Sequence, residues 1–499
     1  MNKKILHSLL ALLVIFALSA CESEQWDDHY EQSDSRLNTD LLALIKADSE
    51  LSTFADLLSQ TGLDEVLSQN QAFTVWAPVN EAFTNVPQEI LDDPERLKAL
   101  IGNHISMYSF ASTSKIEDGL VKVLNNKYIE YINEDGTSSF SGVDVTSNDN
   151  LCSNGILHKI SDVALVRENI WSYFTNSDDF PGMKEFLTQY NVTLFDKDNS
   201  VVTGTNSLGQ TVYDSVFVES NTYFDVIGNL NSEEERYSLV ALTDVVYNDA
   251  YSQISSFYTH PDDDVVTTNT EQTIYNNLNF PWMDTDLMTG EYVTNTFGNM
   301  IYVDQSVLSN EVELSNGSIL IPDSYTFDVN DLIYKPVRYE VEDTERRDVG
   351  SLSDFSINKK YDITASGDFT NKVMFVGESL NEDNNYFEVA FSNVLSAKYD
   401  LYIKYSPVGA TKETQLKFEV TVNGPDGKTV YDIPTEVINN YSEARVKIGD
   451  TYDIPVFVDD NAKNSYYVKV KVIMDVEDAA IVLYDRMVGI DYIELVPAE

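Results

Sequence analysis

The sequence is poor in cysteine, histidine and basic residues, and each shortage excludes a class of mechanism. Among 499 residues there are only 2 cysteines, so no disulfide framework can hold the fold together. Five histidines leave little room for a His-rich metal site or for several His-based catalytic groups. Lys and Arg number 32 against 82 Asp and Glu, a formal net charge of −50 that would repel nucleic acid and anionic lipid.

The chain nevertheless contains enough apolar material to fold. Hydrophobic residues make up 43% and aromatic residues 11%, which excludes intrinsic disorder. The length predicts roughly three domains. We find no nucleophile elbow, metal-ligand spacing or phosphate-binding loop, and among 82 acidic residues a pair of carboxylates is uninformative. We therefore expect a multidomain protein that is not an enzyme and has no cofactor.

The first 20 residues resemble the signal peptide of a bacterial lipoprotein. Lys3 and Lys4 precede an apolar run over residues 5–17, shorter than the roughly 20 residues of a membrane-spanning helix. Leu-Ser-Ala at 18–20 and then Cys21 resemble a lipobox, in which cleavage precedes the cysteine. The resemblance implies that Cys21 is lipidated and anchors the mature chain to a membrane. A plain signal peptide followed by a chance cysteine is the alternative.

Residues 21–36 are expected to form an acidic tether. Glu22, Glu24, Asp27 and Asp28 follow Cys21 closely. The stretch resembles the export signal that directs some Gram-negative lipoproteins to the outer face of the outer membrane, which implies a cell-surface protein. A solvated, flexible tether is the plainer interpretation, and both can hold together.

The pattern over residues 37–170 predicts a first domain of helices and strands. Apolar residues predict helices over three segments, 41–45, 51–58 and 63–67. A buried strand is indicated at 72–77, and Asp93 followed by Pro94 is typical of a helix start. Further strands are expected near 121–124, 128–132 and 156–166.

Two motifs of this domain resemble the signatures of fasciclin domains. Phe-Thr-Val-Trp-Ala-Pro-Val-Asn-Glu-Ala-Phe at 73–83 is similar to the first signature, and Asn-Gly-Ile-Leu-His-Lys-Ile at 154–160 to the second. His104 lies where the family has a central histidine. The motifs depart from the family at Val79, Lys159 and Ser161, which leaves family-specific binding residues open. The resemblance implies a fasciclin fold and extracellular adhesion through protein or matrix contacts.

His104, His158 and Cys152 are the chemically distinctive residues of this domain. The two histidines invite a metal or catalytic interpretation, but neither has a carboxylate or cysteine at ligand spacing beside it. The resemblance implies that both are hydrogen-bonded packing residues. With Cys21 lipidated, Cys152 is a lone thiol, which we interpret as a small buried apolar residue rather than a nucleophile.

Residues 171–340 predict a second, diverged fasciclin-like domain. Residues 236–247 align in type with the first signature. Residues 314–323 resemble the second signature, with Asn-Gly retained and the histidine replaced by Leu320. Between and before these motifs we expect a hairpin at 294–300 and a partly strand-like insertion at 192–229.

The acidic segment His-Pro-Asp-Asp-Asp at residues 260–264 invites a calcium interpretation. Calcium needs oxygen ligands that converge from several positions, which a bare acidic loop does not supply. A solvated turn is therefore the expected structure, and we assign no metal.

Beyond a charged linker at 341–348, residues 341–499 predict an all-β sandwich. Apolar and polar residues alternate over 399–405, 416–422 and 468–472, as in half-buried antiparallel strands. No convincing helical segment appears. The expected fold class is therefore α+β, with two fasciclin-like domains followed by an all-β jelly-roll or sandwich domain.

The segment Gly-Ile-Asp-Tyr-Ile-Glu-Leu at 489–495 resembles the last strand of galactose-binding-like jelly rolls. Many members bind carbohydrate through aromatic side chains, whose flat faces stack on sugar rings. Tyr402, Tyr466 and Tyr467 are the candidate ligand-binding residues. Packing within a sheet is the competing interpretation for each of them, since the chain has 30 tyrosines.

Together the resemblances imply a non-enzymatic outer-membrane lipoprotein for adhesion or ligand binding. The sandwich favours an accessory glycan-binding protein of a polysaccharide-uptake system, working beside an outer-membrane transporter. The alternative is adhesion to an extracellular protein or matrix partner through the fasciclin domains, and a third is a purely structural subunit. No nucleic-acid partner is expected.

Overall fold

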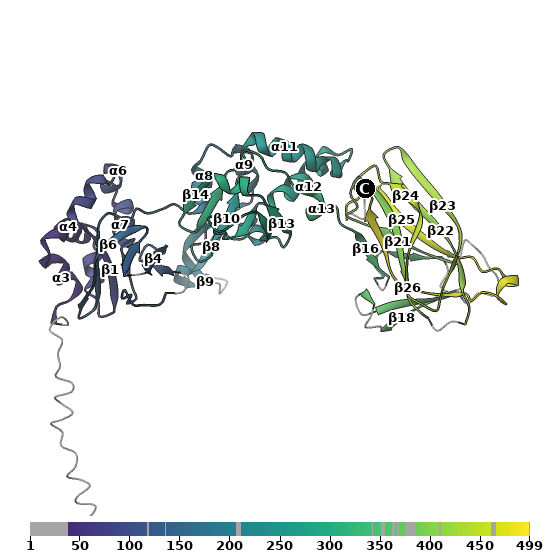
Figure 1. Cartoon of the computed structure of the whole chain (residues 1–499), viewed down its shortest axis with the longest axis horizontal. Helices are drawn as coiled ribbons and strands as arrows, with labels where there is room; N and C mark the ends of the chain where they lie inside the picture. Colours follow the sequence, from purple (N-terminus) through teal and green to yellow (C-terminus); the bar gives the residue numbers. More distant parts are fainter. Residues whose placement is uncertain are drawn as a thin grey trace, which may run out of the picture. The chain divides into compact units, whose positions relative to one another are not determined.

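The computed structural model describes residues 38–498, apart from 117–118, 135, 206–210, 342, 351–354, 362–364, 367–368, 376–384, 409–410 and 461–465 (Figure 1). The predicted signal peptide, Cys21 and the acidic tether lie outside the described residues. The described residues form two compact units. One consists of residues 38–173 with Asn231–Arg236 and Glu313–Gly317, and the other of the remaining described residues. No helix among the described residues is long and apolar enough to cross a membrane.

The helices of the first unit begin and end at residues suited to those places. They are α3 (Leu41–Ala47), α4 (Ser52–Thr61), α5 (Leu63–Leu67), α6 (Gln88–Leu91) and α7 (Pro94–Gly102), with 3-10 turns η2 (Ser49–Leu51) and η3 (Asn80–Asn85). Asp93 accepts hydrogen bonds from the backbone N–H groups of Glu95 and Arg96 and caps α7, as predicted. Gly62 ends α4 with a φ of 72°, which favours glycine.

A seven-stranded sheet of order β2-β1-β7-β6-β5-β4-β3 forms the rest of this unit. β1 (Phe73–Pro78) runs parallel to β7 (Gly155–Ile160) and antiparallel to β2 (Ile105–Ser106). The other strands are β3 (Leu120–Lys122), β4 (Tyr128–Glu134), β5 (Thr137–Phe140) and β6 (Val143–Cys152). All of β1 is buried, because one side packs on the helices and Trp76, on the other side, stacks on Phe140 with ring centroids 4.3 Å apart.

His104 and His158 are both fully buried and hydrogen-bonded. The backbone N–H of Ala164 donates to Nε2 of His104, so Nδ1 carries the proton and donates to the Leu100 carbonyl at 2.8 Å. Nε2 of His158 lies 2.8 Å from the Phe110 carbonyl and is therefore the protonated nitrogen of that ring. Both histidines are therefore hydrogen-bonded packing residues, as the family resemblance implies.

A four-stranded sheet of order β11-β10-β15-β14 repeats the order β2-β1-β7-β6 of the first. Its strands are β10 (Tyr237–Val240), β11 (Asn279–Pro281), β14 (Glu311–Leu314) and β15 (Gly317–Leu320). The backbone N–H of Trp76 donates to the carbonyl of His104, and that of Val240 donates to the carbonyl of Leu278. Leu278 therefore occupies the place of His104 in the second sheet.

The turns before β7 and β15 make the same side-chain contacts. Asn154 Oδ1 accepts from the backbone N–H of Leu41 at 2.8 Å, and its Nδ2 donates to the carbonyl of Leu67. Asn316 Oδ1 accepts from the backbone N–H of Ile170 at 2.8 Å, and its Nδ2 donates to the carbonyl of Ser232. In each case one asparagine ties the turn to the start of a helix.

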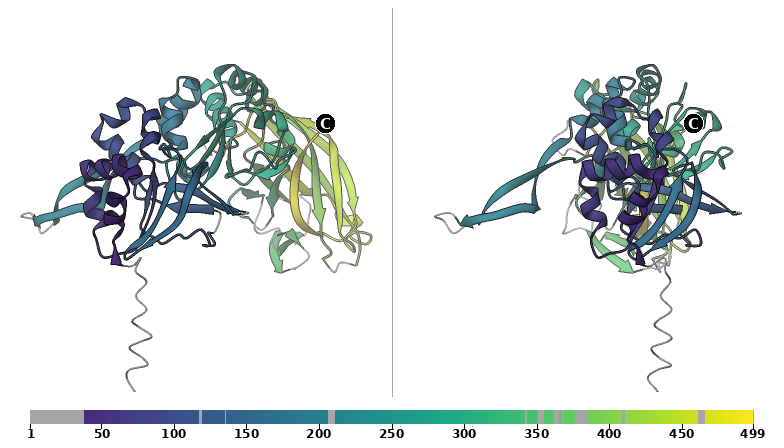
Figure 2. Two further views of the ribbon diagram at one scale, coloured as in Figure 1. Left: turned by 60° about the vertical axis from the view of Figure 1, so that its left-hand side comes forward. Right: turned by 90° about the vertical axis from the view of Figure 1, so that its left-hand side faces the viewer.

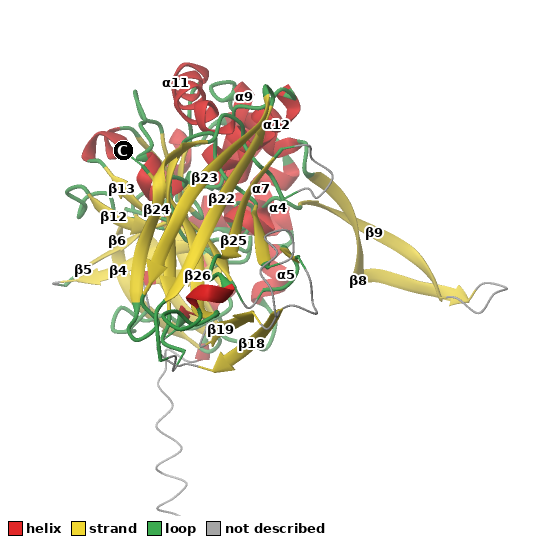
Figure 3. Cartoon of the chain, turned by 90° about the vertical axis from the view of Figure 1, so that its right-hand side faces the viewer, coloured by secondary structure: helices red, strands yellow, loops and turns green. Residues whose placement is uncertain are grey.

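Further elements complete the segment around this second sheet. The helices are α8 (Ile170–Asn176), α9 (Pro181–Thr188), α10 (Phe224–Ile227), α11 (Asp244–Ser255), α12 (Asp263–Tyr275) and α13 (Val329–Leu332), and the expected hairpin is β12 (Glu291–Thr294) and β13 (Met300–Val303). The insertion forms a ribbon of β8 (Asn191–Thr205) and β9 (Thr211–Asn221), which projects from its own unit (Figures 2 and 3).

The C-terminal segment is an all-antiparallel sandwich of two sheets around one apolar core. One sheet has the order β18-β19-β26-β21-β24, with β16 paired to β26, and the other has the order β17-β20-β25-β22-β23. The strands are β16 (Val337–Glu340), β17 (Arg347–Val349), β18 (Phe355–Tyr361), β19 (Phe369–Phe375), β20 (Tyr386–Phe391), β21 (Lys398–Tyr405), β22 (Thr414–Gly424), β23 (Gly427–Ile438), β24 (Ala444–Asp453), β25 (Tyr467–Met474) and β26 (Met487–Pro497). The sandwich and the alternating strands are as predicted.

The structure differs from the prediction around residue 341. β16 pairs with β26 and so belongs to the sandwich, although it precedes the expected boundary. β17 lies partly in the expected linker at 341–348 and pairs with β20. Strands of four and three residues are too short to show a period, and their exposed charged residues suggested a linker instead.

Candidate functional site

One face of the six-stranded sheet carries a regular array of charged and aromatic side chains, which we call the polar face. Strand registers place Arg338, Glu494, Tyr402 and Lys447 in one row across β16, β26, β21 and β24, and Glu340, Tyr492, Lys404 and Arg445 in the next. Alternate residues of the same strands, such as Tyr339, Ile403 and Ile493, are buried in the core. The polar face therefore follows from the two-residue period of the strands.

Glu494 is held between two arginines at the centre of the polar face. Arg338 donates from Nη2 and Nε to Glu494 Oε1 at 2.8 and 3.1 Å. Arg445 donates from Nη2 and Nε to Glu494 Oε2 at 2.7 and 3.2 Å. The Glu494 side chain is 4% exposed, whereas those of Arg338 and Arg445 are 41% and 39% exposed. The carboxylate is thus fully occupied while both guanidinium groups still reach solvent.

Each guanidinium also stacks on a tyrosine. The Arg338 guanidinium lies 3.9 Å from the ring centroid of Tyr492, and that of Arg445 lies 3.7 Å from the ring centroid of Tyr402. The pairing with Glu494 and the stacking together fix the orientation of both arginines. Burial lowers the pKa of each arginine, but the hydrogen bonds to Glu494 outweigh it, so the pKa lies above its ordinary value.

Further ion pairs border this cluster. Lys404 contacts Glu443 and Lys447 contacts Asp400, each with a nitrogen–oxygen distance of 2.8 Å. Burial raises the pKa of Asp400, but the hydrogen bond from Lys447 outweighs it and leaves the pKa below its usual value. Ion pairs therefore hold the charged side chains of the polar face in place.

The three tyrosines predicted as ligand-binding residues do not form one platform. Tyr402 lies on the polar face with its ring under Arg445. Tyr467 begins β25 in the other sheet, where Lys469 Nζ lies 5.3 Å from its ring centroid. Tyr466 precedes that strand, and its ring centroid lies 5.3 Å from that of His260. A ligand bound to one sheet would therefore contact Tyr402 or Tyr467, but not both.

Sequence reasoning missed the residues that organise the polar face, Arg338, Arg445 and Glu494. Glu494 lies within the motif at 489–495, where its partners are not visible because they come from strands about 50 and 156 residues away. The available signal was the occurrence of isolated arginines in otherwise alternating strands. Alternation alone does not show which strands become neighbours.

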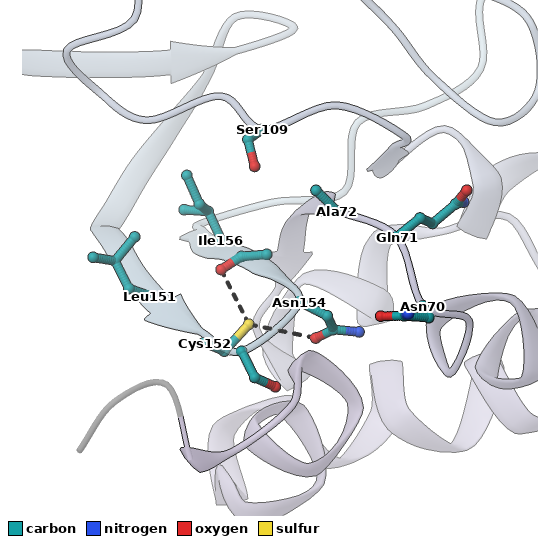
Figure 4. Close-up of a pocket in the computed structure, with 10 residues that line it drawn as sticks. Asn70, Gln71, Ala72, Ser109, Leu151, Cys152, Asn154 and Ile156 are labelled. Atoms are coloured by element: carbon teal, nitrogen blue, oxygen red, sulfur yellow. Dashed lines mark hydrogen bonds between the residues drawn. The ribbon is translucent and has the colours of Figure 1, made fainter. Parts of the chain in front are cut away.

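A concavity lies at the Asn154 turn of the first unit (Figure 4). It has a volume of about 430 Å³ and is lined by Asn70, Gln71, Ala72, Ser109, Leu151, Cys152, Ser153, Asn154, Gly155 and Ile156. The Cys152 thiol is directed at the Gly155 carbonyl at 3.1 Å, and burial raises its pKa. A buried thiol with a raised pKa is a poor nucleophile, which agrees with the interpretation of Cys152 as a packing residue.

The acidic segment at 260–264 forms the start of a helix. The Asp262 side chain accepts from the backbone N–H of Asp264 and caps α12. Across the part of the chain that the structure describes, no group of three or more His, Cys, Asp or Glu residues could hold a metal ion.

The family model described as "Fasciclin domain" matches residues 49–166, so the chain carries a fasciclin domain there, as the two motifs predict. Transforming growth factor-beta-induced protein ig-h3 of Sus scrofa is 26% identical over 136 residues, or 26% of this chain and 20% of that protein. Periostin of Homo sapiens is 29% identical over 137 residues, or 26% of this chain and 16% of that protein. The chain thus spans a fifth or less of the length of these curated relatives.

Two solved structures are weakly similar to parts of this chain. A FAS1 domain pair from the insect cell adhesion molecule fasciclin I covers 57% of this chain and 99% of its own, with 14% identity and a TM-score of 0.23. The CBM22-1 xylan-binding domain from Paenibacillus barcinonensis Xyn10C covers 33% of this chain and 95% of its own, with 10% identity and a TM-score of 0.22. Likenesses at these scores say nothing about function.

Proposed function

We propose that the protein is a non-enzymatic surface lipoprotein that binds a polysaccharide on the polar face of its sandwich. The observation that carries the proposal is the pair of solvent-reaching arginines fixed by Glu494. Fixed planar donors bind ligand hydroxyl groups with little loss of side-chain entropy. An open sheet face that carries charged and aromatic side chains suits an extended chain of sugar hydroxyls better than a small, enclosed ligand.

The hydrogen-bonding capacity of the polar face is not exhausted by its internal contacts. Arg445 uses Nε and Nη2 on Glu494, and its Nη1 has no hydrogen-bond partner among the described residues. Arg338 Nη1 reaches Ser366 Oγ at 3.3 Å. The rings of Tyr402 and Tyr492 support the guanidinium groups from below. In this arrangement the tyrosines position the arginines, and the arginines contact the sugar.

The cellular setting of the proposal rests on the N-terminal motifs. A lipid on Cys21 and the acidic residues after it would hold the sandwich at the outer face of an outer membrane. A glycan captured there would be available to an outer-membrane transporter, so an accessory role in polysaccharide uptake is the setting that we favour.

The test compares variants on the two sheets. The chain from Glu22 onward, which keeps every described residue, is applied to an array of neutral and acidic glycans, and binding is then quantified by calorimetry. Arg445→Lys and Tyr402→Ser are expected to weaken binding at least about ten-fold, because lysine lacks the planar fork and serine removes its support. The matched controls are Arg346→Lys, next to β17, and Tyr467→Ser, on β25 of the opposite sheet. The Arg346 side chain is 40% exposed, close to the 39% of Arg445, and both controls should bind as the parent does.

The outcomes separate the proposal from its competitors. Binding lost only in the opposite-sheet variants would move the site to the other sheet. A blank array from a chain with an intact cooperative melting transition would exclude glycan capture.

Adhesion through the fasciclin domain is the second candidate function. The family match at residues 49–166 favours it. A protein partner retained by the Arg445→Lys variant and unaffected by added sugar would support adhesion over glycan capture.

A further inference from the structure

The ribbon formed by β8 and β9 exposes an unusual amount of apolar surface. Among the described strands, β8 and β9 pair only with each other. Their exposed large apolar side chains are Leu194, Phe195, Val201, Val202, Val212, Val216, Phe217 and Val218, with exposed fractions from 39% to 65%. Soluble monomers rarely expose apolar residues in such a group, and a two-stranded ribbon alone is only marginally stable in water. We therefore expect another protein surface to cover the exposed apolar side chains of the ribbon.

The two edges of the ribbon differ in how well they resist pairing with another strand. β8 carries extra residues between Asp196 and Val201, which interrupt its register, and it contains Lys197 and Gly204. β9 has eleven residues in sequence without a proline, glycine or lysine, and the irregularities of the pairing lie on β8. Bulges, lysine and proline are the usual protections of an edge strand. β9 lacks these three and is the open edge.

We propose that two copies of this chain associate by pairing β9 with β9 in antiparallel orientation about a two-fold axis. An axis through Ser215 places an aromatic residue opposite an aromatic residue and a valine opposite a valine, sets each Asp214 opposite Val216, and puts no like charges opposite each other. The pairs across the axis are Tyr213 with Phe217, Val212 with Val218, and Asp214 with Val216, each occurring twice. Antiparallel pairing of a strand with its own copy satisfies two-fold symmetry and uses the same surface on both chains.

The length of β9 suits pairing with a second copy, and the charge of the chain predicts how that pairing depends on salt. β9 has 11 residues, and an axis through Ser215 pairs the segment Thr211–Glu219 with the same segment of the second copy. The chain's formal charge of −50 opposes association of two copies. This repulsion acts at long range and is screened by salt. Association is therefore expected to strengthen from 0.05 to 0.5 M salt, the reverse of an interface built on ion pairs.

Sedimentation velocity of the chain from Glu22 onward, over a hundred-fold concentration range at both salt concentrations, tests the proposal. We expect the mass to double as concentration rises. Ser215→Lys places two lysines opposite each other at the axis and should raise the dimer dissociation constant by up to about five-fold. Val201→Lys puts the same charge at an exposed position of β8 and should leave dimerisation unchanged.

A second measurement locates the contact between the two copies. A short bis-maleimide reagent should cross-link Ser215→Cys to a covalent dimer, whereas Val201→Cys should give no covalent dimer under the same conditions. A monomer at every concentration and salt, or a dimer that Ser215→Lys leaves intact, would overturn the proposal. In the first case a different protein would have to cover the ribbon. Neither result depends on glycan binding, so the two proposals can fail separately.

Discussion

His104 shows how the burial of one side chain makes stability depend on pH. Its ring is fully buried, and burial lowers its pKa from 6.5 to about 4, although the bond to the Leu100 carbonyl opposes the shift. The ring accepts a hydrogen bond from the backbone of Ala164 through Nε2, which a protonated ring could not do. Burial likewise lowers the pKa of His158. Both rings are therefore neutral in the folded protein at neutral pH.

The free energy of unfolding should fall as pH drops from 6.5 to 4. The unfolded chain binds a proton at His104 below about pH 6.5, and the folded chain does not until about pH 4. Above pH 6.5 the buried His104 ring costs no stability. By pH 4 its burial lowers the free energy of unfolding by about 3 kcal/mol. Urea unfolding at several pH values measures this loss, and NMR titration of His104 checks the cause. A His104 pKa near 6.5 would contradict the argument.

At the scale of elements, the Asn154 turn joins a strand pair to a helix. Gly155 follows Asn154 and opens β7 beside β1. A Cβ on Gly155 would lie 2.1 Å from the carbonyl oxygen of Phe73 and 2.6 Å from Leu41 Cδ1. The glycine is needed because two backbones approach closely there, not because of its φ. The Asn316 turn makes the same contacts before β15, so this arrangement of turn and helix occurs twice among the described residues.

Gly155→Ala should destabilise the first domain by at least about 1–3 kcal/mol, because a backbone atom rather than a flexible side chain must move. Gly102→Ala is the matched control. Its added Cβ would meet neighbours no closer than 3.6 Å, so we expect a change of less than about 1 kcal/mol. Chemical denaturation of both variants measures the difference. Equal stability of the two variants would show that β1 and β7 can move apart at Gly155 without a cost in stability.

At the scale of the whole molecule, the acidic composition and the proposed anchor act together. A formal charge of −50 gives the chain no electrostatic attraction to anionic lipid. Residence at a membrane therefore depends on the lipid proposed at Cys21, since electrostatic attraction does not supply it.

Cys21→Ser is expected to release the protein from the membrane fraction. Serine has no thiol to be acylated, so a variant expressed in a Gram-negative host should move to the aqueous phase on detergent phase partition and should not incorporate labelled palmitate. Cys152→Ser, which removes the buried thiol, should stay in the membrane fraction. Membrane retention of Cys21→Ser would refute the lipid anchor.

Local patterns in the sequence were sufficient for much of the fold. The continuous apolar run at 72–77 and the Asp93–Pro94 pair predict β1 and the start of α7, because burial and capping are set by neighbouring residues. The fasciclin motifs at 73–83 and 154–160 are local in the same way, and the family match confirms them. The strands of the sandwich follow from an alternation visible within each strand.

The polar face and the open edge of β9 were decided only by the tertiary structure. Arg338, Arg445 and Glu494 meet because β16, β24 and β26 pair within one sheet, with β21 between β24 and β26. Phe217 is exposed because, among the described strands, none besides β8 pairs with β9. Residue period shows which side of a strand a residue occupies, whereas strand neighbours are set by contacts between residues far apart in the chain.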